Sequence, residues 1–230
     1  MKQPKTYRHI DGVKVAAKFS KDGNFRYRLD VSLKNPAHKT KTVCVVMQNP
    51  SRAGEEVADK SVKFMEKVVF LKNLPEFADA RRLIVVNQFA RIQTNNFQGL
   101  EQDIGEDNNF EIESVLKESD VIIIGWGSTN GFDERKSFIF DLLGGLEGKQ
   151  FFQTRMHPAR GCFDDFIQPF NQPLADNVRQ RYFAPVIETL EIERMTFAER
   201  VQAMELLWRS MSKVSITGAK YRCLTLSASG

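Results

Sequence analysis

Residues 43–50 have the sequence VCVVMQNP, in which five successive apolar residues precede two amides and a proline. A short, continuous apolar run is typical of a strand that is buried on both faces of a sheet. Proline lacks the backbone N–H that a ladder needs and disfavours helix at the residue before it, so the strand should end near Asn49 and Pro50. The segment therefore predicts a central strand with polar residues at its carboxyl end.

Three more apolar runs follow along the chain. These expected strands are residues 83–86 before Asn87-Gln88, residues 121–124 before Gly125-Trp126-Gly127, and residues 150–154 before His157-Pro158. Segments with helical spacing of apolar residues lie between or after them, at residues 61–71, 108–117 and 135–143. This alternation predicts an α/β fold with a mostly parallel central sheet and helices on both faces. Such sheets bind ligands at the carboxyl ends of their strands.

The two ends of the chain depart from this pattern. Residues 14–18 and 25–31 alternate in polarity, which predicts short strands that form an antiparallel edge or a covering hairpin. Near the other end, Thr196 and Glu199 have the spacing of a capping box before an amphipathic helix. We therefore predict an α/β domain over residues 1–190, followed by a C-terminal amphipathic helix and tail over residues 191–230.

Composition limits the class of protein. The chain has 230 residues, of which 42% are hydrophobic, and 33 Lys plus Arg against 29 Asp plus Glu. It can bury a core, and its slight positive charge permits contact with phosphates without requiring it. Cys44, Cys162 and Cys223 do not form a disulfide framework or a zinc-site pattern, and no apolar run is long enough to cross a bilayer. We expect a cytoplasmic protein with no membrane partner.

The polar side chains at the strand ends, Asn49, Asn87, Trp126 and His157, should converge if the sheet is parallel. Each also has an ordinary explanation, since an Asn-Pro pair forms turns, an asparagine caps helices, the Trp126 segment can be a plain glycine turn and a histidine can be structural. His157 carries the most weight, because imidazole donates a hydrogen bond or takes a proton near neutral pH.

The remaining candidates are weaker. His9 and His38 have the polar surroundings of exposed loops, and helix caps are the more ordinary explanation for the carboxylates Asp59 and Asp107. Ser51 lacks the elbow sequence of a hydrolase nucleophile, and the chain has no Walker A motif or dinucleotide fingerprint. No second His or Cys stands at a metal-ligand spacing from the histidine at position 157. We therefore expect neither a metal nor a cofactor.

The order of these motifs resembles that of a family of uncharacterised bacterial and phage proteins over residues 25–165. The motifs that carry the resemblance are Asn49-Pro50-Ser51 with Ala53 and Asp59, residues 85–90 with Thr94, Asp107-Asn108-Asn109, Trp126-Gly127 and His157-Pro158. More distantly, the same order is similar to that of the uracil-DNA glycosylase superfamily, including its mismatch-specific branch. This resemblance implies a three-layer sandwich and a DNA glycosylase that flips a base out of the duplex.

The resemblance also implies roles for residues. Asn49 matches the residue that positions the attacking water, with Asp59 beyond it, and His157 matches the group that stabilises the departing base. Asn87, with Gln88, Phe89 and Trp126, matches the base-binding segments. Asn49 in place of aspartate is similar to the mismatch-specific branch. Where that superfamily usually has Ser and Leu after the last motif, this chain has Ala159 and Arg160, so the residue that enters the duplex is open.

DNA, chiefly double-stranded with a modified or mismatched base, is the partner that this resemblance implies. The residues expected to contact it lie in or just after the motif loops and are Ser51, Arg52, Arg91, Arg155, Pro158 and Arg160. Because bacteria and phages contest DNA through modified cytosines, such a base is one hypothesis for the substrate. A silent binder of nucleic acid or nucleotide on the same fold is the alternative to an enzyme.

A third alternative concerns the end of the chain. Residues 195–210 resemble the first helix of small addiction-module antitoxins, which would make the protein an interaction partner. An ordinary amphipathic docking helix has the same pattern, and we favour that explanation.

Overall fold

The computed structural model describes residues 5–127 and 131–170. They belong to the first of two compact units of the chain, Met1–Leu174. The predicted boundary between residues 190 and 191, the capping box at Thr196 and the antitoxin-like helix over residues 195–210 all lie outside the described residues.

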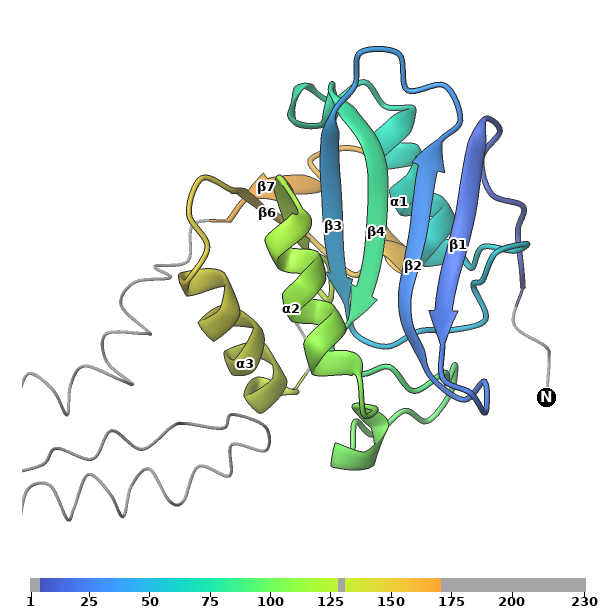
Figure 1. Cartoon of the computed structure of the whole chain (residues 1–230), viewed down its shortest axis with the longest axis vertical. Helices are drawn as coiled ribbons and strands as arrows, with labels where there is room; N and C mark the ends of the chain where they lie inside the picture. Colours follow the sequence, from blue (N-terminus) through green and yellow to red (C-terminus); the bar gives the residue numbers. More distant parts are fainter. Residues whose placement is uncertain (1–4, 128–130, 171–230) are drawn as a thin grey trace, which may run out of the picture. The chain divides into compact units, whose positions relative to one another are not determined.

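The described residues form a seven-stranded sheet in the order β1-β2-β4-β3-β5-β6-β7 (Figure 1). The strands are β1 (Val13–Phe19), β2 (Arg26–Leu33), β3 (Lys41–Met47), β4 (Ala80–Asn87), β5 (Val121–Ile124), β6 (Gln150–Thr154) and β7 (Ile167–Pro169). The four apolar runs of the sequence are thus β3, β4, β5 and β6. They are neighbours at the centre of the sheet, and all four are parallel.

The prediction of a mostly parallel sheet is wrong, because antiparallel pairs flank this centre. β1 pairs with β2, β2 pairs with β4, and β6 pairs with β7, all antiparallel. The expected edge hairpin is confirmed as β1 and β2, whose turn contains Gly23 at φ 72°. The sheet of the described residues is therefore mixed, with a parallel centre and antiparallel edges. In Figure 1 the arrows of β3 and β4 point down while β2 points up.

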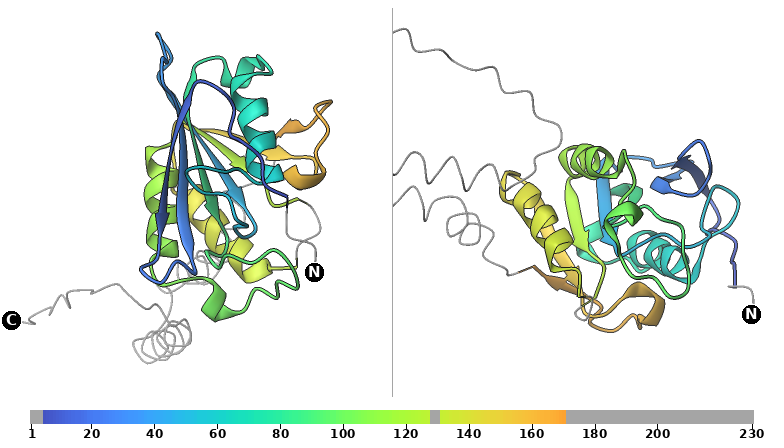
Figure 2. Two further views of the ribbon diagram at one scale, coloured as in Figure 1. Left: turned by 90° about the vertical axis from the view of Figure 1, so that its right-hand side faces the viewer. Right: turned by 90° about the horizontal axis from the view of Figure 1, so that it is seen from below.

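Three α-helices of the described residues cover the sheet: α1 (Lys60–Phe70), α2 (Asn108–Glu118) and α3 (Asp133–Gly144). These confirm the three predicted helices. Short 3-10 turns add η1 (Pro75–Phe77), η2 (Glu101–Asp103) and η3 (Pro158–Arg160). α1 lies on one face of the sheet, and α2 and α3 lie on the other (Figures 1 and 2). The expectation of helices on both faces is confirmed.

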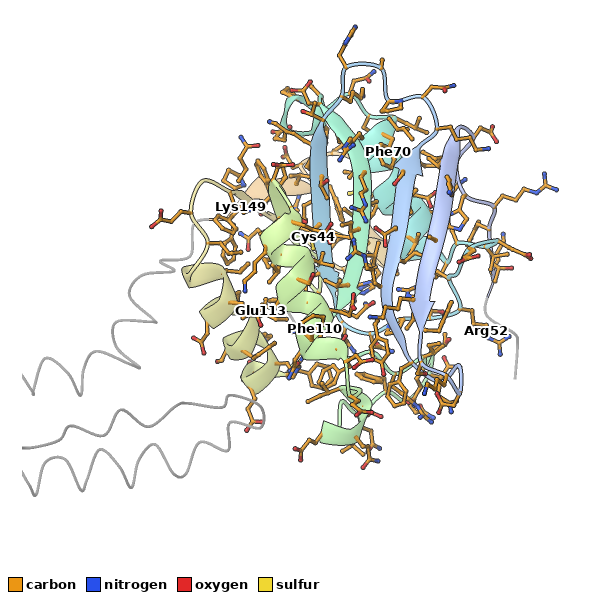
Figure 3. All side chains as sticks on the ribbon, viewed as in Figure 1. Cys44, Arg52, Phe70, Phe110, Glu113 and Lys149 are labelled. Atoms are coloured by element: carbon orange, nitrogen blue, oxygen red, sulfur yellow. The ribbon has the colours of Figure 1, made fainter. Side chains whose placement is uncertain are left out.

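The alternation of side chains along β3 builds both halves of the core. Val43 and Val45 join the apolar cluster under α1, whereas Cys44 and Val46 join the cluster under α2 and α3. All four side chains are buried. Full burial of a side chain of this size is worth about 1.5 to 3 kcal/mol, so the two-sided strand is a main source of stability. Figure 3 shows Cys44 on β3 behind α2.

The prediction that His9 lies in an exposed loop is wrong. Its imidazole contacts the carboxylate of Glu66 through Nδ1, and Nε2 lies 2.9 Å from the carbonyl oxygen of Gly54. Glu66 is fully buried in α1, and its other oxygen accepts from the backbone of Ile10 at 3.0 Å. The partner of His9 lies 57 residues away in the sequence, so local polarity could not indicate it. His38 is exposed, as predicted.

None of the helices in the described parts of the chain is long and apolar enough to span a membrane.

Candidate functional site

The topology creates a crevice at the carboxyl end of β3. The chain leaves β3 for α1 on one face of the sheet, while it leaves the neighbouring strands β4 and β5 for α2 and α3 on the opposite face. In open α/β sheets, ligands bind where neighbouring strands connect to opposite faces. Asn49 follows β3 directly and therefore stands at this point.

A pocket of about 360 Å³ lies at this end of the sheet. Its lining comes from the N-terminal segment, the start of β2, the loop after β3, the start of α1, the loop after β4 and the loop after β6. The lining residues are Lys5, Tyr7, Arg26, Met47, Asn49, Ser51, Asp59, Lys60, Ser61, Gln93, Thr94, His157 and Ala159. The pocket thus brings together the three residues predicted to be catalytic, Asn49, Asp59 and His157.

Asn49 is half-buried and held by its side-chain amide nitrogen. Nδ2 donates to the carbonyl oxygen of Gln93 at 2.6 Å and to that of Pro50 at 3.3 Å. Since both partners are acceptors, the orientation of the amide is fixed, and its carbonyl oxygen Oδ1 is the atom left to accept a hydrogen bond. The side chain therefore ties the loop after β3 to the loop after β4 and offers an acceptor.

Asp59 is the N-cap of α1, which confirms the ordinary explanation for this carboxylate. Its Oδ1 accepts from the backbone N–H of Val62 at 2.9 Å. The same side chain lines the pocket, and its negative charge raises the pKa values of both Arg26 and His157 against the effect of their burial. Asp59 thus caps a helix and also supplies negative charge to the pocket.

His157 is half-buried in the loop between β6 and η3. Its Nδ1 accepts from the backbone N–H of Ala159 at 3.2 Å. Burial lowers the pKa of the ring, and the positive charge of Arg160 lowers it further, although Asp59 opposes both. The ring is therefore neutral near pH 7, and because Nδ1 is the acceptor, the proton sits on Nε2.

Packing holds the His157 loop in place from two sides. Phe64 of α1 stacks on Phe163 and meets the edge of Phe166, with ring centroids 4.7 Å apart in both pairs. On the other side, a Cβ atom at Gly127 would lie 2.9 Å from the backbone nitrogen of His157, and Gly127 has φ 80°. The glycine of the predicted Trp-Gly motif is thus required by close approach of the loops after β5 and β6.

Arg26 is a pocket residue that our sequence reasoning missed. Its side chain is 1% exposed although it is cationic, and it donates from Nη1 to the carbonyl oxygen of Ala53 at 2.8 Å. It begins β2, which runs antiparallel to β4, so the start of β2 lies at the carboxyl end of the parallel strands. A charged residue in a strand of alternating polarity is expected to face solvent, and the sequence offers no signal against that.

Asn87 lies beside Arg26 but does not line the pocket. Its Oδ1 accepts from Arg26 Nη2 at 3.2 Å, and its side chain is 1% exposed. Its backbone carbonyl accepts from Asn108 Nδ2 at 3.1 Å. The segment Asp107-Asn108-Asn109 thus starts α2 as predicted, with Asn108 closing the end of β4, while Asp107 makes no side-chain capping bond.

The other predicted base-binding residues lie elsewhere. Trp126 packs on Phe140 of α3, with ring centroids 5.7 Å apart, in the core under α2 and α3. The rings of Phe89 and Phe132 pack edge to face with centroids 4.9 Å apart, and the backbone carbonyl oxygen of Gln88 accepts a hydrogen bond from Arg135 Nε at 2.9 Å. These three side chains are buried and do not line the pocket.

The predicted DNA-contacting residues surround the site unequally. Ser51 lines the pocket, with its hydroxyl 3.3 Å from that of Thr94, and Pro158 is buried in η3. Arg52, Arg155 and Arg160 are exposed on the loops after β3 and β6, and Figure 3 shows Arg52 projecting outward. Arg91 lies over the ring of Phe25 at 5.3 Å and lines a different hollow.

Within residues 5–127 and 131–170, no group of three or more His, Cys, Asp or Glu side chains could hold a metal ion. The pocket is instead lined by hydrogen-bonding groups and by three cations, Lys5, Arg26 and Lys60, around one carboxylate. These side chains can donate and accept hydrogen bonds and place charge beside a bound ligand.

A comparison with family models matches residues 26–158 to DUF1643, described as a protein of unknown function. No curated protein and no solved structure matches the chain. The matched segment begins at Arg26, ends at Pro158 and contains Asn49, Asp59 and His157. Because the match covers more than half of the 230 residues, this protein belongs to the DUF1643 family.

Proposed function

We propose that this protein is a DNA glycosylase, which hydrolyses the N-glycosidic bond of a flipped modified or mismatched base and leaves an abasic site. One observation carries the proposal: Asn49, Asp59 and His157, which come from three separate loops, line a single pocket. The uracil-DNA glycosylase-like motif order and the helices on both faces of the sheet support it as well.

The reaction needs a hydrogen-bond donor that stabilises the leaving base. Water adds to the sugar carbon C1′ and its proton passes to solvent, while the base departs as an anion with the electrons of the broken C–N bond and takes up a proton from solvent after release. A neutral His157 with its proton on Nε2 is suited to donate to the departing base, because Nδ1 is already occupied by Ala159 N–H. The lowered pKa keeps the ring in that form at neutral pH.

The reaction also needs a positioned water and a countercharge for the sugar. The Asn49 amide nitrogen is bound to two backbone carbonyls, so its oxygen is suited to accept a hydrogen bond from the water. Departure of the base leaves positive charge on the sugar, and the carboxylate of Asp59 supplies the opposite charge. No metal or cofactor takes part in the proposed chemistry.

DNA is the proposed partner, and arginines beside the pocket are its proposed contacts. Pulling a nucleotide out of the stack costs a few kcal/mol, which contacts to the backbone must offset. Arg52, Arg155 and Arg160 are exposed on the loops that carry Asn49 and His157, which supports a role for them in contacts to phosphates around a flipped base. A modified cytosine of phage DNA remains our hypothesis for the base, with defence against phages as the purpose.

The test is incubation with plain, uracil-containing, mismatched and phage-modified DNA, followed by alkali, which cuts abasic sites. We expect strand breaks with one of these substrates for the wild type and far fewer, in the same time, for His157→Ala or Asn49→Ala. DNA that is retarded in a gel but never cut would contradict the proposal and favour a silent binder on the same fold.

A further inference from the structure

Arg26 is a buried cation without a carboxylate partner. Its side chain is 1% exposed, and no ion pair among the described residues includes it. Buried charges in proteins are usually paired, because removal of a charge from water is costly. Two residues further along β2, Arg28 follows that rule and pairs with Asp30 at 2.7 Å and with Glu118 at 2.6 Å.

The hydrogen bonds of Arg26 leave one of its N–H donors without an acceptor among the described residues. Nη1 and Nη2 donate to Ala53 O and to Asn87 Oδ1, but Nε is buried without a partner in the described part of the chain. A guanidinium only donates, so the oxygen of Asn87 must face it, and the amide nitrogen of Asn87 is left without a partner too. Two adjacent buried groups thus have unused donors.

Most of the charges around the pocket have the same sign as Arg26. Lys5 and Lys60 also line it, and so does the first turn of α1, where the helix dipole is positive. The carboxylate of Asp59 is the one acidic group in the described lining, and one of its oxygens is occupied by Val62 N–H. Burial lowers the pKa of Arg26 to about 10, so the guanidinium remains charged at neutral pH.

We propose that Arg26 makes the inner end of this pocket an oxyanion-binding site, with Asn87 and Ala53 as the residues that position its guanidinium. The ligand presents oxygen atoms that carry negative charge and accept hydrogen bonds, the partners for which a guanidinium is best suited. Two sources share this chemistry: a phosphate group, or a pyrimidine base that leaves as an anion. The second source rests on the proposed function.

The probes for the test are inorganic phosphate, barbiturate as a pyrimidine anion, and cytosine as a neutral pyrimidine. Binding to the full chain is measured by the ¹⁵N NMR signal of Arg26 Nε–H and by calorimetry. We expect at least one of the two anions to shift this signal, and cytosine to leave it unmoved. A shift with phosphate alone would identify a phosphate group as the ligand, and a shift with barbiturate alone would identify the base anion.

Two variants and a matched control separate binding from folding. Arg26→Met should weaken anion binding by at least about tenfold, as loss of a charged hydrogen bond does, whereas Arg28→Met in the same strand should not. If Arg26→Met does not fold, Asn87→Asp serves, because it keeps the shape and supplies the missing carboxylate to Arg26. That variant should be no less stable than the wild type and should also bind the anion at least about tenfold more weakly.

The inference is overturned if neither anion shifts the Arg26 signal, if cytosine binds as tightly as the anions, or if both variants bind as the wild type does. These results are independent of base release. Anion binding through Arg26 without base release would contradict the glycosylase proposal and support the oxyanion site. Base release without anion binding would support the glycosylase proposal and contradict the oxyanion site.

Discussion

The imidazole of His9 lies between the carboxylate of Glu66 and the carbonyl oxygen of Gly54, and each ring nitrogen contacts one of these oxygens. Both partners are acceptors, so both nitrogens carry a proton and the ring is a cation. Burial alone would lower the pKa of His9, but the hydrogen bond and charge of Glu66 and the Gly54 carbonyl outweigh it, and the pKa is raised. The pair ties the N-terminal segment to α1 beside the pocket.

The His9–Glu66 pair should make stability depend on pH. A histidine whose pKa is raised in the folded state contributes to the free energy of unfolding. This contribution is complete below the unfolded pKa of about 6.5 and is lost as pH rises through the folded pKa. His9→Ala should lower the free energy of unfolding by about 3 kcal/mol near pH 6, and by less as pH rises toward 9. Chemical denaturation over this range measures the difference, and His38→Ala, at an exposed site, is the control.

Gly127 should tolerate no side chain, because of its conformation and its neighbour. Alanine at Gly148, which has φ 70° and open space around it, isolates the cost of the left-handed backbone, about 1 kcal/mol. Gly127→Ala adds a clash with His157 and should cost roughly 2 to 4 kcal/mol in all. Equal losses of stability in the two variants, measured by urea denaturation, would mean that the two loops are not in close contact.

Asn49→Asp should destabilise the folded protein, although aspartate is a stronger base than asparagine. The amide nitrogen of Asn49 donates to two backbone carbonyls, and a carboxylate there would place acceptor against acceptor at the 2.6 Å contact with Gln93. We expect Asn49→Asp to lower the free energy of unfolding by about 1 to 3 kcal/mol at neutral pH, and by more than Asn49→Ala does. A variant as stable as the wild type would show that the side chain is not held as described.

The pKa of His157 should be shifted downward, whereas that of His9 is shifted upward. Its pKa is lowered by burial and by Arg160, so its NMR titration midpoint should lie below the unperturbed value of about 6.5. The stability that the neutral ring provides is present above about pH 6.5 and is lost as pH falls, because the unfolded chain takes up the proton more readily. Arg160→Ala should raise the midpoint, and an unchanged midpoint would contradict the assigned cause.

The sequence predicted the centre of the fold and part of the site for one physical reason. Buried parallel strands are continuous apolar runs, and the residues that end them meet at one edge, so the sequence alone was enough to place Asn49 and His157 together. The same reasoning misplaced Trp126, because a residue just after a buried strand can turn into the core, where this indole packs on Phe140.

The residues that were missed depend on long-range pairing. Arg26 reaches the site because β2 runs antiparallel to β4, a register that no local pattern in the sequence contains. The side chain of His9 is only 8% exposed because it contacts Glu66, far along the chain, which accepts a hydrogen bond from Nδ1. The mixed character of the sheet has a related origin, since β1 and β2 were predicted as an antiparallel edge or hairpin, but neither the pairing of β2 with β4 nor the edge strand β7 was predicted.

The proposed glycosylase activity is tested by mass spectrometry of the free bases released from mismatched and phage-modified DNA by the wild type, His157→Ala and His38→Ala. We expect the wild type and His38→Ala to release one kind of base and to leave one abasic site for each base released, and His157→Ala to be slower by about 100-fold or more. Release of no base from any DNA, or equal release by His157→Ala, would contradict the proposed glycosylase activity.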